Sequence, residues 1–289
     1  MGSAPLVAFV TYSGIPDLTA DDRLAVAALG GLGVQTDAVC WDDARVDWSR
    51  YGAIVLRSTW DYFRRIAEFR AWIDRLEAMG APLWNRPATL RWNTDKRYLS
   101  DLAHPNLAPP PGTFFVKGAR IDLAALLDAR GWTEAVVKPT ISADGFSTER
   151  ASRATAGEDQ AVVDAMVARS DVMIQRLVPE IRTGGELSLM FFGGAFSHAV
   201  NKQPKRGEFR VQERLGGVIS PAVAPVRLVR HATGLLEAAA PDSLYARVDV
   251  VVAEDRFVLM ELELVEPSLF LEHAFGAAKA FATAILGVT

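Results

Sequence analysis

Cysteine is nearly absent from this sequence, because Cys40 is the single one among 289 residues. One thiol cannot build an intramolecular disulfide framework or a cysteine-based metal cluster. Without such bridges, the chain is expected to work in the reducing environment of the cytoplasm.

Excess positive charge and a membrane-spanning apolar stretch are absent too. Lysine and arginine number 31 against 35 aspartates and glutamates, so the formal net charge is −4 and nucleic acid is not an expected partner. The N-terminus has no basic region followed by an apolar run, which argues against a signal peptide. The most apolar segment, Leu269–Val288, carries Glu272, His273 and Lys279, so we expect a buried helix and no contact with a membrane.

The composition is otherwise that of a globular protein, since half of the residues are hydrophobic and the length suits about two domains with cores. The first third of the chain alternates short apolar runs with helical periodicity. We expect strands at Pro5–Tyr12, Val34–Cys40 and Ala53–Leu56, and a helix at Thr19–Leu29 that Thr19 caps. This order predicts a small α/β unit whose parallel sheet is covered on both sides.

A cluster of polar and aromatic residues follows the third strand, at the strand end where parallel sheets place ligand contacts. It reads RSTWDY and leads into a helix expected at Phe63–Met79. A cation and hydroxyl groups at this position suit a small anion such as a carboxylate. The candidate substrate-binding residues are therefore Arg57, Ser58, Thr59 and Asp61. The alternative is a helix cap, with Trp60 in the core.

Two lysines lie where a bound anion would be stabilising. Lys96 falls in the first turn of a helix capped by Asn93 or Thr94, where a cation opposes the helix dipole unless an anion is bound. Lys138 ends an apolar strand and precedes the hydroxyl-rich loop Ser142–Thr148. Such a loop can turn backbone N–H groups towards phosphate oxygens, although the Walker A spacing is absent. Taken alone, a solvated lysine remains the default explanation.

The rest of the chain alternates strands and helices joined by connectors that contain proline and glycine. Strands are expected at Phe114–Lys117, Ala135–Pro139, Asp171–Leu177, Glu186–Phe192 and Ala195–Val200, and helices at Leu123–Leu127, Glu158–Ala168 and Arg227–Ala238.

Three carboxylates gather on a predicted hairpin near the C-terminus. Two apolar runs within Tyr245–Ser268 flank a polar turn at Ala253–Arg256, which predicts antiparallel strands. Glu261 and Glu263 share one strand face because side chains alternate, and Asp249 can lie opposite them. Such acids repel one another unless a cation lies between them, and oxygen ligands suit Mg²⁺ before Zn²⁺. The alternative is a solvent-facing strand edge with spare acids.

The order of these segments resembles the ATP-grasp superfamily, and within it the glutathione-synthetase and RimK-like carboxylate–amine ligases. From about Val7 to the end of the chain, the matching segments are Asn93–Lys96, Val137–Pro139, Gln175–Val178, Gly207–Gln212 with Gly216 and Gly217, and the acidic hairpin. The resemblance implies an α/β ATP-grasp fold with an α+β lid and a Rossmann-like N-terminal domain. The expected domains are residues 1–88 (Rossmann-like), 89–178 (central region with the lid) and 179–289 (C-terminal subdomain with the metal site).

The resemblance also implies a role for each matching residue. ATP would be bound by Lys96, Lys138, Ser142 and Gly145, by the backbone of Gln175, Arg176, Leu177 and Val178 at adenine, and by Glu186 at ribose. Magnesium, expected as two ions, would be bound by Asp249, Glu261 and Glu263. The family usually has Glu-x-Asn in that motif, so Glu263 adds a negative charge. The candidate catalytic residues are Arg210, which would hold transferring phosphoryl and acyl oxygens, and Lys202, which would reach phosphate or substrate.

A narrower resemblance is to the branch that contains the cycloserine-forming cyclo-ligase. It rests on RSTWDY (Arg57–Tyr62), LWN (Leu83–Asn85), RWNTDK (Arg91–Lys96) and FSHAVNK (Phe196–Lys202). It implies an enzyme that uses ATP to activate the carboxylate of O-ureido-serine as an acyl phosphate and then closes a ring, forming D-cycloserine.

Several alternatives stay open at this level. An intermolecular ligase resembling glutathione synthetase, or a non-catalytic nucleotide-binding module, would use the same nucleotide residues. Glu266 or Asp61 could remove the proton from the attacking nitrogen, and His198 is expected to be structural. The substrate is expected to be a small amino-acid-like molecule, and exposed apolar helices leave a homodimer open.

Overall fold

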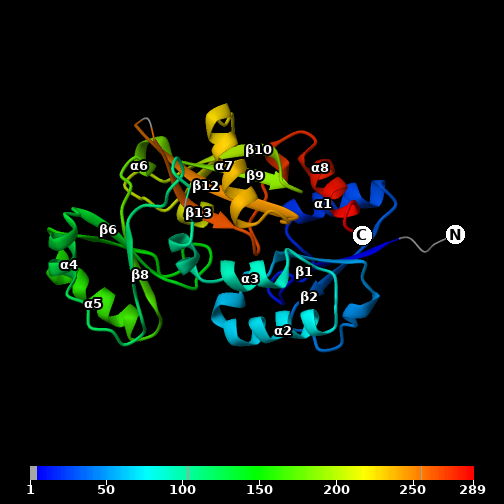
Figure 1. Cartoon of the computed structure of the whole chain (residues 1–289), viewed down its shortest axis with the longest axis horizontal. Coiled ribbons are helices and arrows are strands. Elements are labelled where there is room, and N and C mark those ends of the chain that lie inside the picture. Colours follow the sequence, from blue (N-terminus) through cyan, green and yellow to red (C-terminus); the bar gives the residue numbers. More distant parts are fainter. Residues whose placement is uncertain (1–4, 103, 255) are drawn as a thin grey trace.

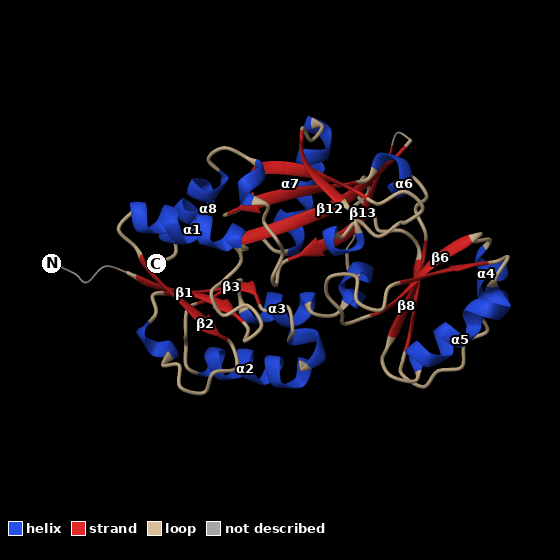
Figure 2. Ribbon diagram, turned by 180° about the vertical axis from the view of Figure 1, so that it is seen from behind, coloured by secondary structure: helices blue, strands red, loops and turns tan. Residues whose placement is uncertain are grey.

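The computed structural model describes residues 5–102, 104–254 and 256–289 of the chain. Three β-sheets are found among these residues: one in the N-terminal domain, one in a lid that protrudes to one side, and one in a C-terminal subdomain (Figures 1 and 2). Each sheet falls within one of the three expected residue ranges, and the exact boundaries between the domains stay a prediction.

The N-terminal sheet is parallel and has the strand order β2-β1-β3-β4. Its elements are β1 (Leu6–Thr11), α1 (Ala20–Gly31), β2 (Gln35–Cys40), β3 (Ala53–Ser58), α2 (Ile66–Ala78) and β4 (Leu83–Trp84). Strand side chains alternate faces, so Val7 and Phe9 share a core with α1, whereas Ala8 lies in the core shared with α2. The predicted α/β unit is confirmed, and Thr19 caps α1 by accepting a hydrogen bond from the Asp22 amide at 3.0 Å.

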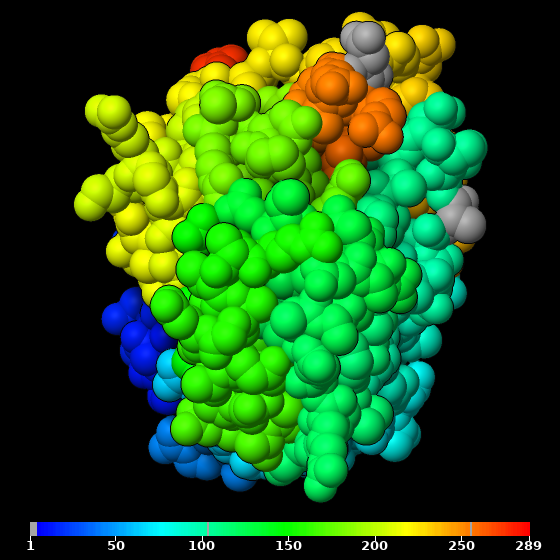
Figure 3. All heavy atoms as spheres, turned by 90° about the vertical axis from the view of Figure 1, so that its left-hand side faces the viewer, coloured from blue at the N-terminus to red at the C-terminus, as the bar shows by residue number. Residues whose placement is uncertain are grey.

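The lid is an antiparallel sheet of order β5-β8-β6-β7 with two helices on one face. Its elements are β5 (Gly112–Phe115), α4 (Leu123–Arg130), β6 (Glu134–Pro139), β7 (Glu149–Ser152), α5 (Ala156–Val167) and β8 (Val172–Arg176). Ala135 and Val137 form the lid core with Leu127 and Val163, so Lys138 projects from the opposite face of β6. Figure 3 shows the lid, in green, as the face of the molecule nearest the viewer.

The C-terminal sheet is antiparallel in the order β11-β10-β9-β12-β13. The elements of this subdomain are α6 (Ile181–Gly184), β9 (Glu186–Phe192), β10 (Ala195–Gln203), β11 (Val218–Ala222), α7 (Val226–Ala239), β12 (Tyr245–Ala253) and β13 (Arg256–Glu263). Helix α7 covers one face of the sheet, where Leu228 and Leu235 share a core with Leu189 and Val248. The predicted acidic hairpin is confirmed as β12 and β13, and Asp255 of its turn lies outside the described residues.

Two connecting elements, α3 (Pro87–Asn93) and the 3-10 helix η3 (Lys96–Ser100), fix the central segment to the C-terminal sheet. Asn85, just before α3, donates hydrogen bonds to two carbonyl oxygens of that subdomain at 2.8 and 2.9 Å. Asn93 donates to the carbonyl of Leu262 at 2.7 Å. These side chains satisfy buried carbonyl groups at the start of β12 and at the C-terminal end of the acidic strand β13.

The last helix, α8 (Ala277–Leu286), leaves the C-terminal subdomain and returns to the N-terminal domain. Its residue Phe281 packs against Phe9 of β1, with ring centroids 6.4 Å apart. Figure 1 shows α8 beside α1, at the same end of the molecule as the N-terminus. None of the described helices has the length and apolarity that crossing a membrane requires.

Two local predictions need correction. The helix expected at Phe63–Met79 starts three residues later, because the backbone of Arg65, with φ of −131° and ψ of 39°, is not helical and separates the 3-10 turn η2 (Tyr62–Arg64) from α2. Lys96 lies in η3, whose cap is Asp95; the Asp95 side chain accepts a hydrogen bond from the Arg97 amide at 3.0 Å. Neither Asn93 nor Thr94 provides this cap, since both belong to the end of α3.

Arg57 forms a buried tie between the N-terminal sheet and the C-terminal residues. Its Nε donates to Asp22 Oδ1 at 2.8 Å, and one Nη donates to the carbonyl of Pro267 at 2.8 Å. The side chains of Arg57 and Asp22 are only 1% and 3% exposed. The guanidinium also lies over the rings of Tyr245 and Phe281, at 5.2 and 5.5 Å from their centroids. Removing one member of such a pair leaves an uncompensated buried charge.

We therefore expect Arg57→Ala to lower the free energy of unfolding by about 3–5 kcal/mol, the usual cost of breaking a buried ion pair on one side. Urea unfolding followed by circular dichroism measures this loss. Arg50→Ala is the control, because Arg50 faces Asp37 at 3.7 Å on the exposed surface and its loss should hardly move the urea midpoint. Equal midpoints for the two variants would contradict the structural role of Arg57.

Candidate active site

Three carboxylates meet on the hairpin β12–β13. Asp249 lies directly opposite Glu261 in the antiparallel register, and Glu263 lies opposite Arg247. Oxygen atoms of Asp249, Glu261 and Glu263 all fall within 4.8 Å of one another. The period-two alternation of strand side chains puts them on one face, as expected from the sequence. We call Asp249, Glu261 and Glu263 the acid cluster.

Asp249 is surrounded by hydrogen-bond donors. Its carboxylate accepts from Ser188 Oγ at 2.6 Å, from Lys202 Nζ at 3.1 Å and from Arg247 Nη2 at 2.9 Å. Burial favours the neutral acid, but Arg247 and Lys202 outweigh it and hold the pKa of Asp249 well below its usual range. Asp249 is therefore an ionised carboxylate at neutral pH.

The other two acids also face cations. Glu261 lies 3.5 Å from Lys96 Nζ and 3.6 Å from Lys138 Nζ, and these lysines lower its pKa although burial raises it. Burial raises the pKa of Glu263 to about 8 although Arg247 forms an ion pair with it, and the neighbouring carboxylates of Asp249 and Glu261 raise the pKa as well. Arg247 is thus the cation that faces the carboxyl group added to the family pattern.

Lys202 completes this arrangement from β10. Its Nζ lies 2.6 Å from Glu186 Oε1 and 3.1 Å from Asp249 Oδ2. Burial disfavours the ammonium form, but Asp249 and Glu186 raise the pKa of Lys202 and keep it charged. The carboxylates that take part are Glu186, Asp249, Glu261 and Glu263, and the cations are Lys96, Lys138, Lys202 and Arg247. Four carboxyl groups therefore face four basic side chains.

A cavity of about 120 Å³, which we call the inner cavity, opens beside these charges. It brings together most of the residues expected to bind nucleotide or metal: Lys96, Lys138, Ser142, Gly145, Gln175, Glu186, Lys202, Arg210, Asp249 and Glu261. They come from the lid, from η3 and from the C-terminal sheet, so the cavity lies between the lid and the rest of the molecule. This convergence of distant segments favours a functional site over a solvated strand edge.

Arg210 lies on the loop between β10 and β11. Its Nη2 donates to Glu208 at 2.8 Å, and its Nη1 donates to the carbonyl of Thr148 in the lid loop at 3.2 Å. The Nε of Arg210 is buried and has no hydrogen-bond partner among the described residues. A buried donor without a partner is costly, so the hydrogen bonding of Arg210 is incomplete in this structure.

The loop Ser142–Thr148 has the backbone expected of an anion-binding loop. Asp144, Gly145 and Ser147 all have positive φ values, of 51°, 63° and 49°. A Cβ at Gly145 would lie 3.1 Å from the side chain of Gln212, which explains the glycine there. Lys96 Nζ donates to the carbonyl of Ser142 at 2.7 Å and fixes the start of the loop. The amides of Phe146 and Thr148 donate to carbonyls within the loop, at 3.0 and 3.2 Å, so the binding of phosphate by this loop stays a prediction.

A second cavity, of about 350 Å³, adjoins the first, and we call it the outer cavity. Both are lined by Ala143, Asp144, Lys202, Val211, Gln212 and Arg247. The outer cavity is further lined by Trp60, Glu213, Arg214, Ile219, Glu263, Glu266, Ser268 and Phe270. A small molecule in the outer cavity would therefore lie next to the acid cluster.

The structure corrects the expectation for the RSTWDY run. Arg57, Ser58 and Thr59 are buried and line neither the inner nor the outer cavity, since Arg57 is engaged by Asp22 and Pro267. Asp61 accepts a hydrogen bond from Trp41 Nε1 at 2.8 Å and also lies outside both cavities. The residue of this run that faces the outer cavity is Trp60, which the sequence placed in the core under the alternative reading.

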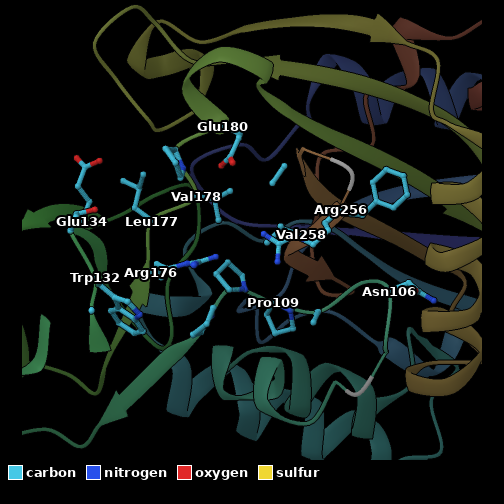
Figure 4. A pocket seen from close by; sticks show the side chains of 18 of the residues that line it. Asn106, Pro109, Trp132, Glu134, Arg176, Leu177, Val178, Glu180, Arg256 and Val258 are labelled. Carbon is cyan, nitrogen blue, oxygen red and sulfur yellow. The ribbon is translucent and has the colours of Figure 1, made fainter. Parts of the chain in front are cut away.

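The segment expected at adenine faces two ways. Gln175 lines the inner cavity. The side chains of Arg176, Leu177 and Val178, where the lid joins the C-terminal subdomain, line a third cavity, which we call the hinge cavity (Figure 4). The amides of Arg176 and Leu177 already donate to the carbonyls of Pro111 (2.9 Å) and Glu134 (3.1 Å). Those two amides are thus engaged within the protein in this structure, and the contact of the segment with adenine stays a prediction.

The hinge cavity, of about 840 Å³, is the largest of the three, yet it contains none of the acid cluster. Figure 4 shows Arg176 and Arg256 extending into it from the lid side and from the C-terminal sheet. Its size alone does not make it the reaction site, because the convergent charges lie in the inner cavity.

Two residues of the site were missed in the sequence. Arg247 shares a strand face with Asp249 because they are two positions apart, and the pattern Arg-x-Asp could have shown this. Ser188, which donates to Asp249, comes from β9, and no local sequence signal marks it because β9 and β12 pair only in the folded sheet.

Comparison with known proteins agrees with this geometry. A family model described as the N-terminal domain of D-cycloserine synthetase DcsG matches residues 7–85. The cycloserine biosynthesis protein DcsG of Streptomyces lavendulae is 33% identical over 276 residues, covering 88% of this chain and 89% of that protein. The crystal structure of D-cycloserine synthetase DcsG has a TM-score of 0.87 at 30% identity and covers 98% of this chain and 100% of that chain.

A more distant structure supports the fold alone. The RimK-domain ATP-grasp protein from Sphaerobacter thermophilus DSM 20745 has a TM-score of 0.68 at 20% identity, with 98% of this chain and 100% of that chain covered. The ATP-grasp fold expected from the sequence is confirmed by these similarities, as is an enzyme over a mere nucleotide-binding module. The chain belongs to the D-cycloserine synthetase DcsG family of ATP-grasp carbon–nitrogen ligases.

Proposed function

We propose that this ligase uses ATP to activate the carboxylate of O-ureido-serine and then closes the ring of D-cycloserine within that single substrate. The observation that carries the proposal is the direct contact between two cavities. The inner cavity has the charges for a nucleotide, and the outer cavity, at about 350 Å³, has room for a small amino acid beside it.

The acid cluster fits magnesium. Its three carboxylates offer hard oxygen ligands within 4.8 Å of one another, a donor set that suits Mg²⁺. Bound there, magnesium would neutralise charge on the phosphates and on the transferring phosphoryl group. Asp249, Glu261 and Glu263 would hold it, and a count of two ions stays our expectation from the family resemblance.

The cations of the site would change partners when nucleotide binds. Lys96 and Lys138 now neutralise Glu261, and Lys202 neutralises Glu186 and Asp249. A triphosphate would attract these lysines, and the carboxylates they release would be free to bind metal. Nucleotide and metal should therefore enter together. The inner cavity is smaller than a nucleotide needs, so the lid has to open for entry.

The chemistry follows from this placement. The γ-phosphoryl group moves from ATP to a carboxylate oxygen of the substrate, which yields ADP and an acyl phosphate. The ureido nitrogen attached to oxygen then attacks the carbonyl carbon and loses its proton to solvent, while the bond from that carbon to the phosphate oxygen breaks and phosphate leaves. The ring nitrogen still carries the carbamoyl group, so D-cycloserine forms when one water hydrolyses that group to carbon dioxide and ammonia. Arg210 and Arg247 line the inner cavity, where they would stabilise the negative charge of the tetrahedral intermediate.

Partners and compartment follow from the composition and surface. A small amino-acid-like molecule is the proposed substrate, and the cytoplasm is the proposed compartment because the chain has a single thiol. A homodimer stays a prediction. The exposed apolar side chains that could serve it are Val223, Val226 and Phe275.

Product analysis tests the proposed substrate. With magnesium and ATP present, we expect O-ureido-D-serine to stimulate ADP release without any second amino acid. Mass spectrometry should then show the substrate minus one water, or the ring after loss of its carbamoyl group. ADP release that requires a second amine, with a linear amide as product, would instead establish an intermolecular ligase.

Removal of magnesium tests the exchange of partners. Calorimetry should show ATP binding weakened about tenfold or more by EDTA, the effect of losing one charged hydrogen bond or more. Magnesium without nucleotide should give little heat, because lysines already neutralise the acid cluster. Glu261→Gln should abolish most of the magnesium dependence. The exposed Glu237→Gln on α7 is the matched control and should keep it.

Two substitutions separate the roles of the cations. Arg210→Ala should lower kcat by about 100-fold or more, since it removes one electrostatic contact to the transition state, with little change in KM for ATP. Lys138→Ala should raise KM for ATP as well as lower kcat, because its ammonium faces the inner cavity. Lys205→Ala, in the same loop as Arg210 but exposed, serves as control. Equal and mild effects of Arg210→Ala and Lys138→Ala would contradict these roles.

A further inference from the structure

The outer cavity contains one carboxylate that is not paired. Four acids line it, but Asp144 pairs with Arg214 and Glu263 pairs with Arg247. Glu213 is exposed and therefore solvated. Among the described residues, the carboxylate of Glu266 accepts no hydrogen bond and forms no ion pair within 4 Å. Glu266 is thus the acid of this cavity with free capacity for a ligand.

Glu266 is held where its charge is poorly solvated. Burial raises its pKa to about 7, although Lys96 and Arg247 act in the opposite direction. A half-buried, poorly solvated carboxylate is stabilised by a cationic group of a ligand, because the attraction between the two charges compensates for the hydration lost on burial. The same reasoning applies to no other acid of the outer cavity, since the others have a partner or solvent.

Two aromatic residues line the same cavity as Glu266. Trp60 Nε1 donates to the backbone carbonyl of Glu266 at 3.1 Å, which fixes the indole beside it. Phe270 has a φ of 50°, in the left-handed region that non-glycine residues rarely occupy, and its ring lies 5.6 Å from the guanidinium carbon of Arg247. The indole of Trp60 and the free carboxylate together suit a primary ammonium, because aromatic rings attract such groups.

His198 keeps Phe270 in this strained backbone. Its Nε2 lies 3.0 Å from the carbonyl of Leu269 and 3.1 Å from that of Phe270, and burial lowers its pKa, so it acts as a neutral donor. Its Nδ1 lies 3.0 Å from Ser197 Oγ. The structural role expected for His198 is thus to position Phe270, which lines the outer cavity.

The sequence left Glu266 and Asp61 as equal candidates for the base that removes the proton from the attacking nitrogen. The structure separates them, because Asp61 is bonded to Trp41 and lies 3.8 Å from Arg65, outside both cavities. Glu266 lines the same cavity as Arg247 and Glu263, next to the place where the substrate carboxylate would be activated.

We propose that Glu266, with Trp60 beside it, binds the α-ammonium group of the substrate, so that the enzyme selects carboxylic acids carrying a free amino group. The inference rests on the proposed function of the outer cavity as the amino-acid site. It assigns Glu266 to substrate recognition and not to proton removal. The carboxylate of the same amino acid would then face Arg210 and Arg247.

The test compares two ligands and two proteins. The ligands are O-ureido-D-serine and its desamino analogue, 3-(ureidooxy)propanoic acid. Each is titrated into the wild type and into Glu266→Gln in the presence of magnesium and ADP. The kcat and the KM for each compound are then measured with ATP. The wild type should prefer the amino compound by about 10- to 100-fold, the effect of one charged hydrogen bond. Glu266→Gln should lose most of that preference through KM, with kcat and KM for ATP near wild type.

One control variant and three contrary results complete the test. Glu272→Gln, an exposed glutamate two residues after Phe270, should keep the full preference. An unchanged preference in Glu266→Gln, or a fall in kcat at constant KM, would overturn the inference, and the second result would assign proton removal to Glu266. A wild type that binds neither compound but binds another amino acid over its desamino analogue would refute the proposed substrate and leave the ammonium site supported.

Discussion

The acids of β12 and β13 can share one buried strand pair only because four cations meet them there. Lys96 comes from η3, Lys138 from the lid, Lys202 from β10 and Arg247 from β12 itself. Each cation belongs to a different element, so the charge balance depends on the whole molecule being assembled. The same balance links structure to chemistry, since the lysines that hold the carboxylates apart are those a triphosphate would recruit.

Much of the fold and part of the site follow from local patterns. Period-two alternation put Asp249, Glu261 and Glu263 on one face, and the hairpin register confirms Asp249 opposite Glu261. The N-terminal α/β unit, the lid strand that carries Lys138 and the helix cap at Thr19 follow from equally local signals. These predictions succeed because each depends on neighbours a few residues apart along the chain.

The predictions that failed depend on contacts between distant segments. Arg57 resembled a ligand-binding cation at a strand end, but its partner Pro267 is 210 residues away and no local pattern links the two. Trp60, three residues on, faces the outer cavity because its indole reaches the carbonyl of Glu266. Ser188 donates a hydrogen bond to Asp249 only because β9 pairs with β12 in the folded sheet. The sequence therefore located the polar cluster at the correct strand end. It could not show which of its side chains would be buried and which would face a cavity.

The return of α8 to the N-terminal sheet has a consequence for biosynthesis on the ribosome. Phe281 fills the face of β1 next to Phe9 and lies under the guanidinium of Arg57, so the core of the N-terminal domain is completed by a helix that comes much later in the chain. During translation, this apolar face of the nascent sheet stays uncovered until α8 has been made. Emergence of the N-terminal domain from the ribosome is therefore not enough to close that core.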